Sequence, residues 1–382
     1  MDKIGKRDFF RIKVCHITTV HSPFDVRIFH KECKTLAKSG YEVYLIAQHD
    51  KEEIVDGIHL IPLPIVRSRI RRMIYLPIRA LKEALKLKAN IYHFHDPELI
   101  PIGVLLKVFA KGKVIYDVHE DVPKQIISKY WIPKKLRGII SFIVNLGEKK
   151  FSFLFDAIIT ATDDILKNFS FYRNAISIKN YPMLSKFLEV KGKEKKDDVF
   201  KIIYIGGLSK IRGISEVVKA LEYVDSNKEV RLILCGKFSP IEYEKEVRNL
   251  KGFEKVDYLG WLEPDEVVNK LVDADVGIVC LHPITNYVTA LPVKLFEYMA
   301  AGLPVIASNF PLWREIVEGN NCGICVDPLN PKEIAEAIKY LIEHPDKAQK
   351  MGENGKKAVL EKYNWEKESE KLIKLYEDLL HG

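Results

Sequence analysis

ALPVKLFEYMAAGLPVIAS, residues 290–308, has the pattern of a helix followed by a buried strand. Pro292 stands where a helix can begin, because the first helical position leaves its N–H unpaired in any case. Gly302 stands where such a helix ends, and Pro304 opens the apolar run that follows. The segment therefore predicts one helix-to-strand step of an α/β fold.

The same alternation extends outward through the whole chain. In the N-terminal half, apolar runs predict strands at 13–20, 42–47, 58–62, 91–95, 114–119 and 157–161, with helical spacing at 28–37, 70–87 and 99–109. In the C-terminal half, strands are predicted at 201–205, 230–235, 256–259, 276–280 and 304–307, and helices at 215–223, 242–250, 264–271, 293–301, 332–344 and about 346–380. The strands show little polar alternation, as expected when helices cover both faces of a parallel sheet. We predict two Rossmann-like, doubly wound α/β domains in tandem with an interdomain cleft.

One charged segment, LEVKGKEKKDD at 188–198, lacks apolar periodicity and is predicted to be a linker. It separates an N-terminal domain at 1–187 from a C-terminal domain at 199–363. Residues 364–382 are predicted to form a final helix, with a break near Asn364.

Charge is unevenly distributed. Residues 1–185 carry 31 Lys and Arg against 19 Asp and Glu, whereas the remainder carries 29 against 33. The basic half is expected to meet an anionic partner. The start of the sequence has no long apolar run and the six cysteines are scattered, so we expect no signal peptide and a cytoplasmic protein.

Two segments of the C-terminal half carry chemistry. In IGGLSKIRG, residues 205–213, glycines let backbone N–H groups approach a phosphate, and Lys210 and Arg212 add charge. The pattern is neither a dinucleotide fingerprint nor a P-loop, and a tight structural turn also explains it. Glu297 lies within the predicted helix at 293–301. It is either a residue of the functional site or an ordinary solvent-facing residue of the helix.

Together the two segments resemble the retaining group 1 glycosyltransferases, family 4, which have the GT-B fold. Supporting motifs are YLGWL at 258–262, GNNCGICVDP at 319–328 and HITTVHSPFD at 16–25. The resemblance covers nearly the whole chain and implies a hexosyltransferase. Such an enzyme would move a sugar from a nucleotide-sugar, with retention, to a polysaccharide, lipid-linked oligosaccharide or glycolipid acceptor. It also implies that the helix at 364–382 crosses back to the N-terminal domain.

The resemblance further implies roles for individual residues. Glu297 matches the glutamate that accepts hydrogen bonds from the ribose hydroxyls of the donor. Arg212 stands at the place of a diphosphate-binding lysine, while Gly207 replaces an arginine and Thr289 replaces a glutamate that contacts the donor sugar. The diphosphate would then depend on Arg212, Lys294 and the backbone at Gly206 and Gly207. Neighbouring candidate contacts to sugar or acceptor are Ala290 and Leu291.

In the N-terminal half, His119 matches the histidine that in the family lies beside the donor sugar, near the reacting carbon. Alternatively, His119 is only a histidine at a strand end whose hydrogen bonds are satisfied within the protein. His95 and Asp96 follow an apolar strand, where Asp96 either lines the site or caps the next helix. His21, Asp25 and Arg27 either contact the acceptor or pair with each other. The family implies no metal and no cofactor, and CGIC at 322–325 is interpreted as packing.

Basic residues flank apolar ones in RSRIRRMIYL at 67–76 and KKLRGIISFIV at 134–144. This pattern suits peripheral contact with an anionic membrane surface, whereas a core helix would equally explain 139–146. Nucleic acid is not expected as a partner, because no recognised binding module is present. Two further functions also fit the sequence: a non-catalytic paralogue that partners an active transferase, and a nucleotide-sugar 2-epimerase of the same fold.

Overall fold

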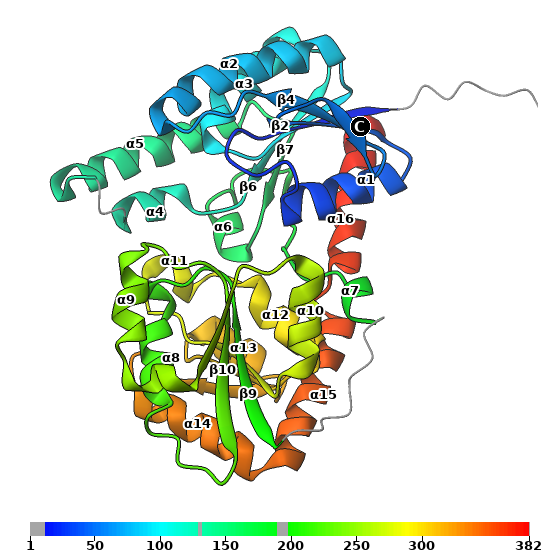
Figure 1. The fold of residues 1–382 in the computed structure, drawn as a ribbon. Helices are drawn as coiled ribbons and strands as arrows, with labels where there is room; N and C mark the ends of the chain where they lie inside the picture. The colour runs from blue at the N-terminus through cyan, green and yellow to red at the C-terminus, as the bar shows by residue number, and fades with distance from the viewer. Residues whose placement is uncertain (1–11, 129–131, 189–197, 382) are drawn as a thin grey trace, which may run out of the picture. The chain divides into compact units, whose positions relative to one another are not determined.

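The computed structural model describes residues 12–128, 132–188 and 198–381 (Figure 1). Backbone contacts divide the chain into two compact units, Met1–Lys179 with Glu368–Gly382, and Asn180–Lys367. The first unit ends before the sequence-based boundary at 187 because Tyr181 and Phe187 are buried in the core of the second. Residues 189–197 of the predicted linker lie outside the described residues.

The first unit is built on an eight-stranded sheet, with strand order β3-β4-β2-β1-β5-β6-β7-β8. All neighbouring strands are parallel except β3 and β4. Its strands are β1 (Lys13–Ile17), β2 (Glu42–Gln48), β3 (Glu53–Val55), β4 (Ile58–Leu63), β5 (Ile91–Phe94), β6 (Lys113–Val118), β7 (Ala157–Thr160) and β8 (Ala175–Ser177).

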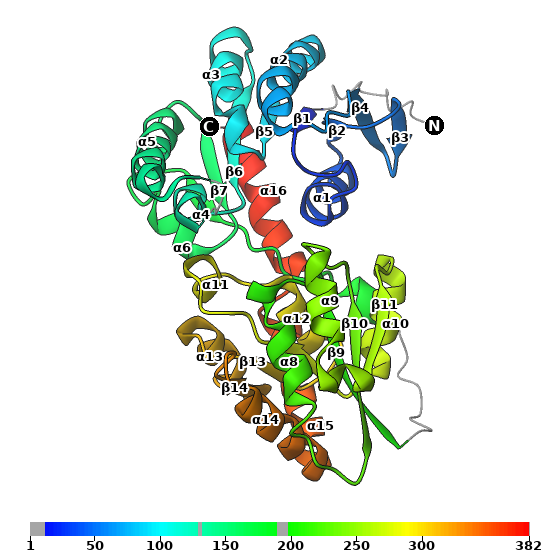
Figure 2. The same ribbon diagram turned by 60° about the vertical axis from the view of Figure 1, so that its left-hand side comes forward.

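Helices lie on both faces of this sheet (Figure 2). They are the π-helix η1 (Val26–Cys33), α1 (Lys34–Lys38), α2 (Arg69–Leu87), the 3₁₀ turn η2 (Pro97–Leu99), α3 (Ile100–Phe109), α4 (Val122–Ser128), α5 (Lys134–Ser152), α6 (Asp163–Lys167) and most of α16 (Trp365–His381). One core joins α2 and α3 to alternate residues of the central strands, such as Cys15, Tyr92 and Tyr116. The opposite face of these strands carries the buried polar residues His16, His93 and Asp117 next to apolar ones, so this second face of the sheet holds a polar cluster.

The second unit has a six-stranded, wholly parallel sheet of order β11-β10-β9-β12-β13-β14. Its strands are β9 (Val199–Ile205), β10 (Glu229–Cys235), β11 (Val256–Gly260), β12 (Val276–Val279), β13 (Val305–Ser308) and β14 (Gly323–Val326). Its helices are α7 (Ser185–Leu188), η3 (Lys210–Arg212), α8 (Ile214–Ala220), α9 (Glu242–Arg248), η4 (Lys251–Lys255), α10 (Pro264–Asp273), α11 (Thr285–Val288), α12 (Val293–Ala300), α13 (Pro311–Val317), α14 (Pro331–Glu343) and α15 (Pro345–Glu361).

Both sheets are doubly wound, as the sequence predicts. In each, the first strand of the unit is central: β1 lies between β2 and β5, and β9 lies between β10 and β12. The chain therefore changes direction beside that strand. Open parallel sheets bind ligands beyond the carboxyl ends of their strands at such a switch point. This rule directs attention to the loops after β1 and β5 and to those after β9 and β12.

Candidate functional site

In the first unit, neighbouring strands end in polar side chains. His95 and Asp96 follow β5, His119 follows β6, and Asp117 is the last but one residue of β6. His95 Nδ1 and His119 Nε2 lie 3.2 and 2.9 Å from the same oxygen, Oδ2 of Asp117. Asp117 therefore links the buried His95 to His119, whose side chain keeps 14% of its exposure. His119 is the member of this group that a substrate can reach.

Arg27 anchors Asp117 from the other side. Its Nε and Nη2 donate to the two carboxylate oxygens at 3.1 and 3.0 Å, and Nη1 donates to the carbonyl of Ile178 at 2.8 Å. Burial alone would raise the pKa of the Asp117 carboxyl, but the Arg27 charge and hydrogen bonds from His119 and His95 hold it well below its usual range. Every nitrogen of the Arg27 guanidinium thus has a protein partner, which is Asp117 or Ile178 and not His21 or Asp25, while the predicted contact of Arg27 with a sugar acceptor stays a prediction.

Asp25 begins the helix η1. Its Oδ1 accepts hydrogen bonds from the N–H groups of Arg27 and Ile28, and His21 lies 3.4 Å from Oδ2. Burial would raise the pKa of the Asp25 carboxyl, but the bonds from His21 and Ile28 outweigh it and lower the pKa. Asp25 and His21 are both only partly buried, so this pair remains accessible.

Asp96 stands at the capping position before η2, but its side chain does not cap that turn. Its Oδ2 instead accepts from the Thr18 hydroxyl at 2.9 Å and from the N–H of Thr19. His21 Nε2 lies 3.6 Å from the other oxygen. Asp96 therefore shapes the loop after β1 and holds His21 beside it.

Deeper in the sheet lie residues that the sequence analysis missed: His16, Glu32, His93 and Tyr376. His16 and His93 face each other in the β1–β5 register, and His16 Nδ1 lies 3.0 Å from His95 Nε2. The sequence held one signal for this cluster. His93 and His95 are two residues apart, so strand alternation places them on one face.

In the second unit, the glycine loop follows β9. Gly206 has a left-handed φ of +114°, and Gly213 has a φ of +70° before α8 begins. A Cβ on Gly206 would lie 3.0 Å from Lys294 Nζ, and one on Gly207 would lie 3.5 Å from Cζ of Arg212. Two basic side chains therefore gather over the glycine pair, as the sequence analysis expected of a phosphate loop.

Lys294 is held in an unusual state. Its Nζ is buried, has no hydrogen-bond partner among the described residues and lies 3.8 Å from the centre of the Tyr204 ring. Burial, with the nearby Arg212 charge, lowers the pKa of Lys294 well below its usual value, while Glu297 opposes the shift. Arg212 contacts the hydroxyls of Tyr204 and Tyr287. Two basic side chains therefore lie at the glycine loop, and among the described residues no carboxylate is hydrogen-bonded to Lys294.

The remaining candidates cluster around the start of α12. Glu297 lies one turn after Lys294 and is half-buried, so it is not a fully solvent-facing residue. Thr289, Ala290 and Leu291 form the half-buried segment between α11 and α12. The carbonyl of Ala290 accepts from Trp313 Nε1 at 2.7 Å, which fixes this segment to α13. The structure therefore brings the second unit's candidates together at the ends of β9 and β12.

Cys322 and Cys325 are free thiols. Cys322 is buried in the core of the second unit, and its Sγ contacts the carbonyls of Ile316 and Val317. Burial raises the pKa of both thiols to about 12, which disfavours reactive thiolates. This environment agrees with a packing role.

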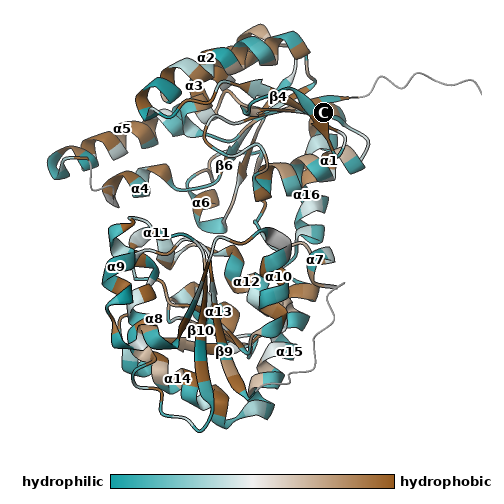
Figure 3. Cartoon of the chain, viewed as in Figure 1, coloured by the Kyte–Doolittle hydropathy of each residue, from teal (hydrophilic) through white to brown (hydrophobic). Residues whose placement is uncertain are grey.

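Figure 3 shows hydrophobic residues along two helices of the first unit, α5 and α2, and several of them are exposed. On α5 they are Leu136, Ile139, Phe142, Ile143 and Leu146, and on α2 they are Ile70, Met73, Ile74 and Ile78. The interpretation of 139–146 as a core helix is therefore wrong for these side chains. In the described part of the chain, no helix is long and apolar enough to cross a membrane.

The chain is similar to known proteins along both of its units. Residues 26–175 match the family described as glycosyltransferase family 4, and residues 186–358 match glycosyl transferases group 1. An uncharacterised glycosyltransferase of Methanocaldococcus jannaschii is 22% identical over 96% of this chain and 98% of its own length. The capsular polysaccharide biosynthesis glycosyltransferase CapM of Staphylococcus aureus is 24% identical over 96% and 97%.

Solved structures agree on the fold. A sucrose-phosphate synthase of Thermosynechococcus elongatus superposes with a TM-score of 0.76 at 18% identity, covering 97% of this chain and all of its own. HepE of Anabaena, in complex with UDP and glucose, superposes with a TM-score of 0.72 at 14% identity, covering 96% of this chain and all of its own. With one family model matching in each α/β unit, the chain belongs to the group 1 glycosyltransferases of the family 4 type and has the GT-B fold.

Proposed function

We propose that the protein is a retaining hexosyltransferase that uses a nucleoside-diphosphate sugar and builds a cell-surface polysaccharide, lipid-linked oligosaccharide or glycolipid. The second unit would hold the donor, and the first would bind the acceptor and supply His119. CapM, named for capsular polysaccharide biosynthesis, supports a glycan acceptor. HepE, solved with UDP-glucose, makes uridine nucleotides the first donors to test.

The observation that carries the proposal is the pair Lys294 and Arg212 over Gly206 and Gly207. Because Lys294 Nζ is buried without a hydrogen-bond partner among the described residues, its charged form is disfavoured there; a bound diphosphate would supply opposite charge and acceptors and would stabilise the ammonium. The absence of side chains at the two glycines leaves room for phosphate oxygens near the backbone. Glu297, on the same helix, would accept hydrogen bonds from the ribose diol, since a carboxylate offers only acceptors.

In the first unit, His119 would contact the transferring sugar. Its Nε2 is 2.9 Å from Asp117, so it can donate there and present its other nitrogen to a sugar hydroxyl. No covalent nucleophile and no metal enters this scheme. Leaving-group charge would be stabilised by Lys294 and Arg212, and the acceptor hydroxyl would react where binding holds it.

A calorimetric and thermal-shift screen against UDP-, GDP-, dTDP- and ADP-sugars tests the donor site. One of these donors is expected to raise the melting temperature of the wild type. Lys294→Met and Glu297→Ala should weaken its binding by about tenfold or more, which corresponds to about 1.4 kcal/mol. The exposed Lys219→Met and Glu336→Gln serve as controls and should bind like the wild type.

His119→Ala should lower the transfer rate more than the donor affinity, because in this proposal the nucleotide contacts of the donor are all in the second unit. Release of nucleoside diphosphate should require acceptor. Donor isomerisation without acceptor would instead indicate an epimerase, and donor binding without any turnover would indicate a non-catalytic paralogue. Wild-type transfer by both His119→Ala and Glu297→Ala would refute the proposed site.

The exposed apolar face of α5, beside Lys134 and Lys135, supports contact with an anionic lipid surface and hence a peripheral, cytoplasmic enzyme. Phe142 and Ile143 keep 66% and 61% of their exposure. We expect co-sedimentation with vesicles that contain phosphatidylglycerol, and weaker binding to purely zwitterionic ones. Phe142→Glu with Ile143→Glu should abolish it, whereas Ile241→Glu, at an exposed site of the second unit, should not.

A further inference from the structure

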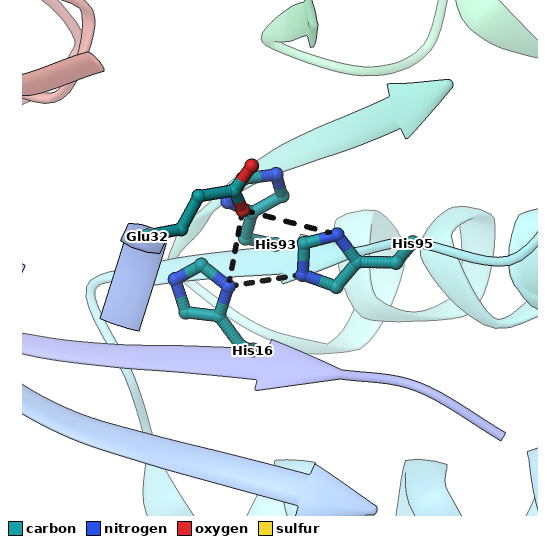
Figure 4. A group of neighbouring side chains, drawn as sticks. All are labelled: His16, Glu32, His93 and His95. Carbon is teal, nitrogen blue, oxygen red and sulfur yellow. Dashed lines mark hydrogen bonds and ion pairs between the residues drawn. The ribbon is translucent and has the colours of Figure 1, made fainter. Parts of the chain in front are cut away.

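A closed cluster of imidazoles and a carboxylate lies beneath the candidate site of the first unit (Figure 4). It consists of His16 from β1, Glu32 from η1, and His93 and His95 from the end of β5. Each residue offers one ligand atom, and the four atoms lie within 4.8 Å of one another. All four side chains are fully buried or nearly so, with exposures of 0 to 2%.

The outward-facing ring nitrogens already have partners. His93 Nδ1 lies 2.7 Å from the Tyr376 hydroxyl, and His16 Nε2 lies 3.3 Å from the same oxygen. His95 Nδ1 lies 3.2 Å from Oδ2 of Asp117. Histidines that bind metal commonly donate their second N–H to a carboxylate or another oxygen, which fixes the tautomer that leaves the other nitrogen free. These contacts would leave His16 Nδ1, His93 Nε2 and His95 Nε2 facing the cluster.

The inward-facing atoms are poorly satisfied. His93 Nε2 and both oxygens of Glu32 are buried without a hydrogen-bond partner among the described residues. Glu32 Oε1 forms an ion pair with Arg27 at 3.0 Å, while Oε2 lies 4.0 Å from His16 Nδ1 and also 4.0 Å from His95 Nδ1, the nitrogen that pairs with Asp117. A proton shared by His16 and His95 would satisfy their 3.0 Å contact but would leave His93 Nε2 without a partner among the described residues. Buried polar atoms without partners cost free energy, and a bound cation would give His93 Nε2 and Glu32 a partner.

We propose that His16, Glu32, His93 and His95 bind a zinc ion. Zinc takes four nitrogen, sulfur or oxygen ligands in a tetrahedron, and bonds of about 2.0 to 2.2 Å place neighbouring ligand atoms about 3.3 Å apart. His16 Nδ1 lies 3.0 Å from His95 Nε2 and 4.0 Å from Glu32 Oε2. Only small side-chain shifts are needed to bring these atoms to the spacing of zinc ligands. Imidazole ligands favour zinc over Mg²⁺ or Ca²⁺, which prefer oxygen.

The surroundings suit such an ion. Asp117 and Glu32 place two carboxylates beside the single guanidinium of Arg27, so a cation does not leave the cluster strongly positive. Four protein ligands would fill a tetrahedron, which is the mark of a structural site. The ion would tie η1 to β1 and β5 beneath His119. This inference departs from the sequence-based expectation of no metal, and the proposed transfer does not depend on it.

The test is the metal content of the full chain, purified without a histidine tag. We expect about one zinc per chain by elemental analysis, removal by a strong chelator with a fall in melting temperature, and recovery on adding ZnSO₄. CoCl₂ added to the chelated protein should give the intense visible absorption of a tetrahedral site. Wild type without stoichiometric metal, and with no change of melting temperature on adding zinc, would overturn the proposal.

Variants locate the ion. Glu32→Gln and His93→Gln should lower zinc affinity at least tenfold, whereas His59→Gln, on β4 and outside the cluster, should keep it. Equal zinc content in all three variants would place the ion elsewhere and reject this site. If Glu32→Gln or His93→Gln does not fold, the zinc content and cobalt spectrum of the wild type decide the question.

Discussion

The hydroxyl of Tyr376 lies 2.7 Å from Nδ1 of His93, although 283 positions separate the two residues. Tyr376 is on α16, near the end of the chain, and its ring is fully buried within the first unit. The hydroxyl also lies 3.3 Å from His16 Nε2. One group from the last helix thus bridges two histidines on adjacent strands of the sheet.

Tyr376→Phe keeps the ring and removes this bridge. Two buried imidazole nitrogens then lose a partner, so we expect the free energy of unfolding to fall by about 1 to 3 kcal/mol. Urea denaturation of the full chain measures it. Tyr223→Phe, at a site that keeps 52% of its exposure, is the matched control and should change stability by less than about 0.5 kcal/mol. Equal effects of the two substitutions would contradict the bridge.

Arg27 and Arg314 offer a contrast between buried and exposed ion pairs. Arg27→Met leaves Asp117 and Glu32 buried without their cation, and should lower the free energy of unfolding by about 3 to 5 kcal/mol. Arg314 pairs with Glu318 at 2.9 Å, but both side chains are exposed, so Arg314→Met should cost less than about 1 kcal/mol. Chemical denaturation of both variants checks the difference. A small effect at Arg27 would mean that its network is not formed in solution.

Two glycines of the phosphate loop should respond differently to alanine. A Cβ on Gly213 would lie 1.8 Å from the carbonyl oxygen of Cys280, and its φ of +70° strains any side chain. Gly213→Ala should therefore lower the melting temperature strongly, with a cost on the order of 2 kcal/mol or more. At Gly207 the nearest atoms are 3.5 Å away on the flexible Arg212 side chain, so Gly207→Ala should fold normally. Similar melting temperatures for both variants would contradict this loop geometry.

The regular elements were predictable from the sequence because apolar periodicity and helix-ending residues act locally. The stretch at 290–308 gives α12 and β13 within one residue at each end. The missed strands β3, β8 and β14 have only three or four residues each, too few for a clear pattern. The exposed face of α5 was likewise ambiguous, since an apolar run does not say whether another part of the chain covers it.

The site was predictable only where strand ends determine it. His95, Asp96 and His119 lie together because parallel strands end at one edge of a sheet. The partner of Arg27 was not predictable, because Asp117 is 90 positions away and nothing local joins them. The cluster of His16, Glu32, His93 and His95 combines residues from β1, η1 and the end of β5. It could not be predicted, because only tertiary packing brings these elements together. The roles of Glu297, Lys294 and Arg212 toward a donor stay predictions.

Glu148 makes stability depend on pH. On α5, its Oε1 accepts a hydrogen bond from the Tyr116 hydroxyl at 2.7 Å, and its side chain is buried. Burial raises the pKa of the Glu148 carboxyl from 4.5 to about 7. The folded state therefore binds more protons than the unfolded state between these values, so stability should fall as pH rises through this window. Each pKa unit corresponds to about 1.4 kcal/mol.

Glu148→Gln keeps an acceptor for Tyr116 and removes the titration. The free energy of unfolding of Glu148→Gln should exceed that of the wild type least near pH 4.5 and most above pH 7, where the wild type must bury a charged carboxylate. Urea denaturation at pH 5 and pH 8 measures the difference. Glu361→Gln, at an exposed carboxylate of α15, should leave the pH dependence of the wild type in place. Because the remaining titratable groups are shared by all three proteins, parallel pH profiles for wild type and Glu148→Gln would show that Glu148 is not buried as described.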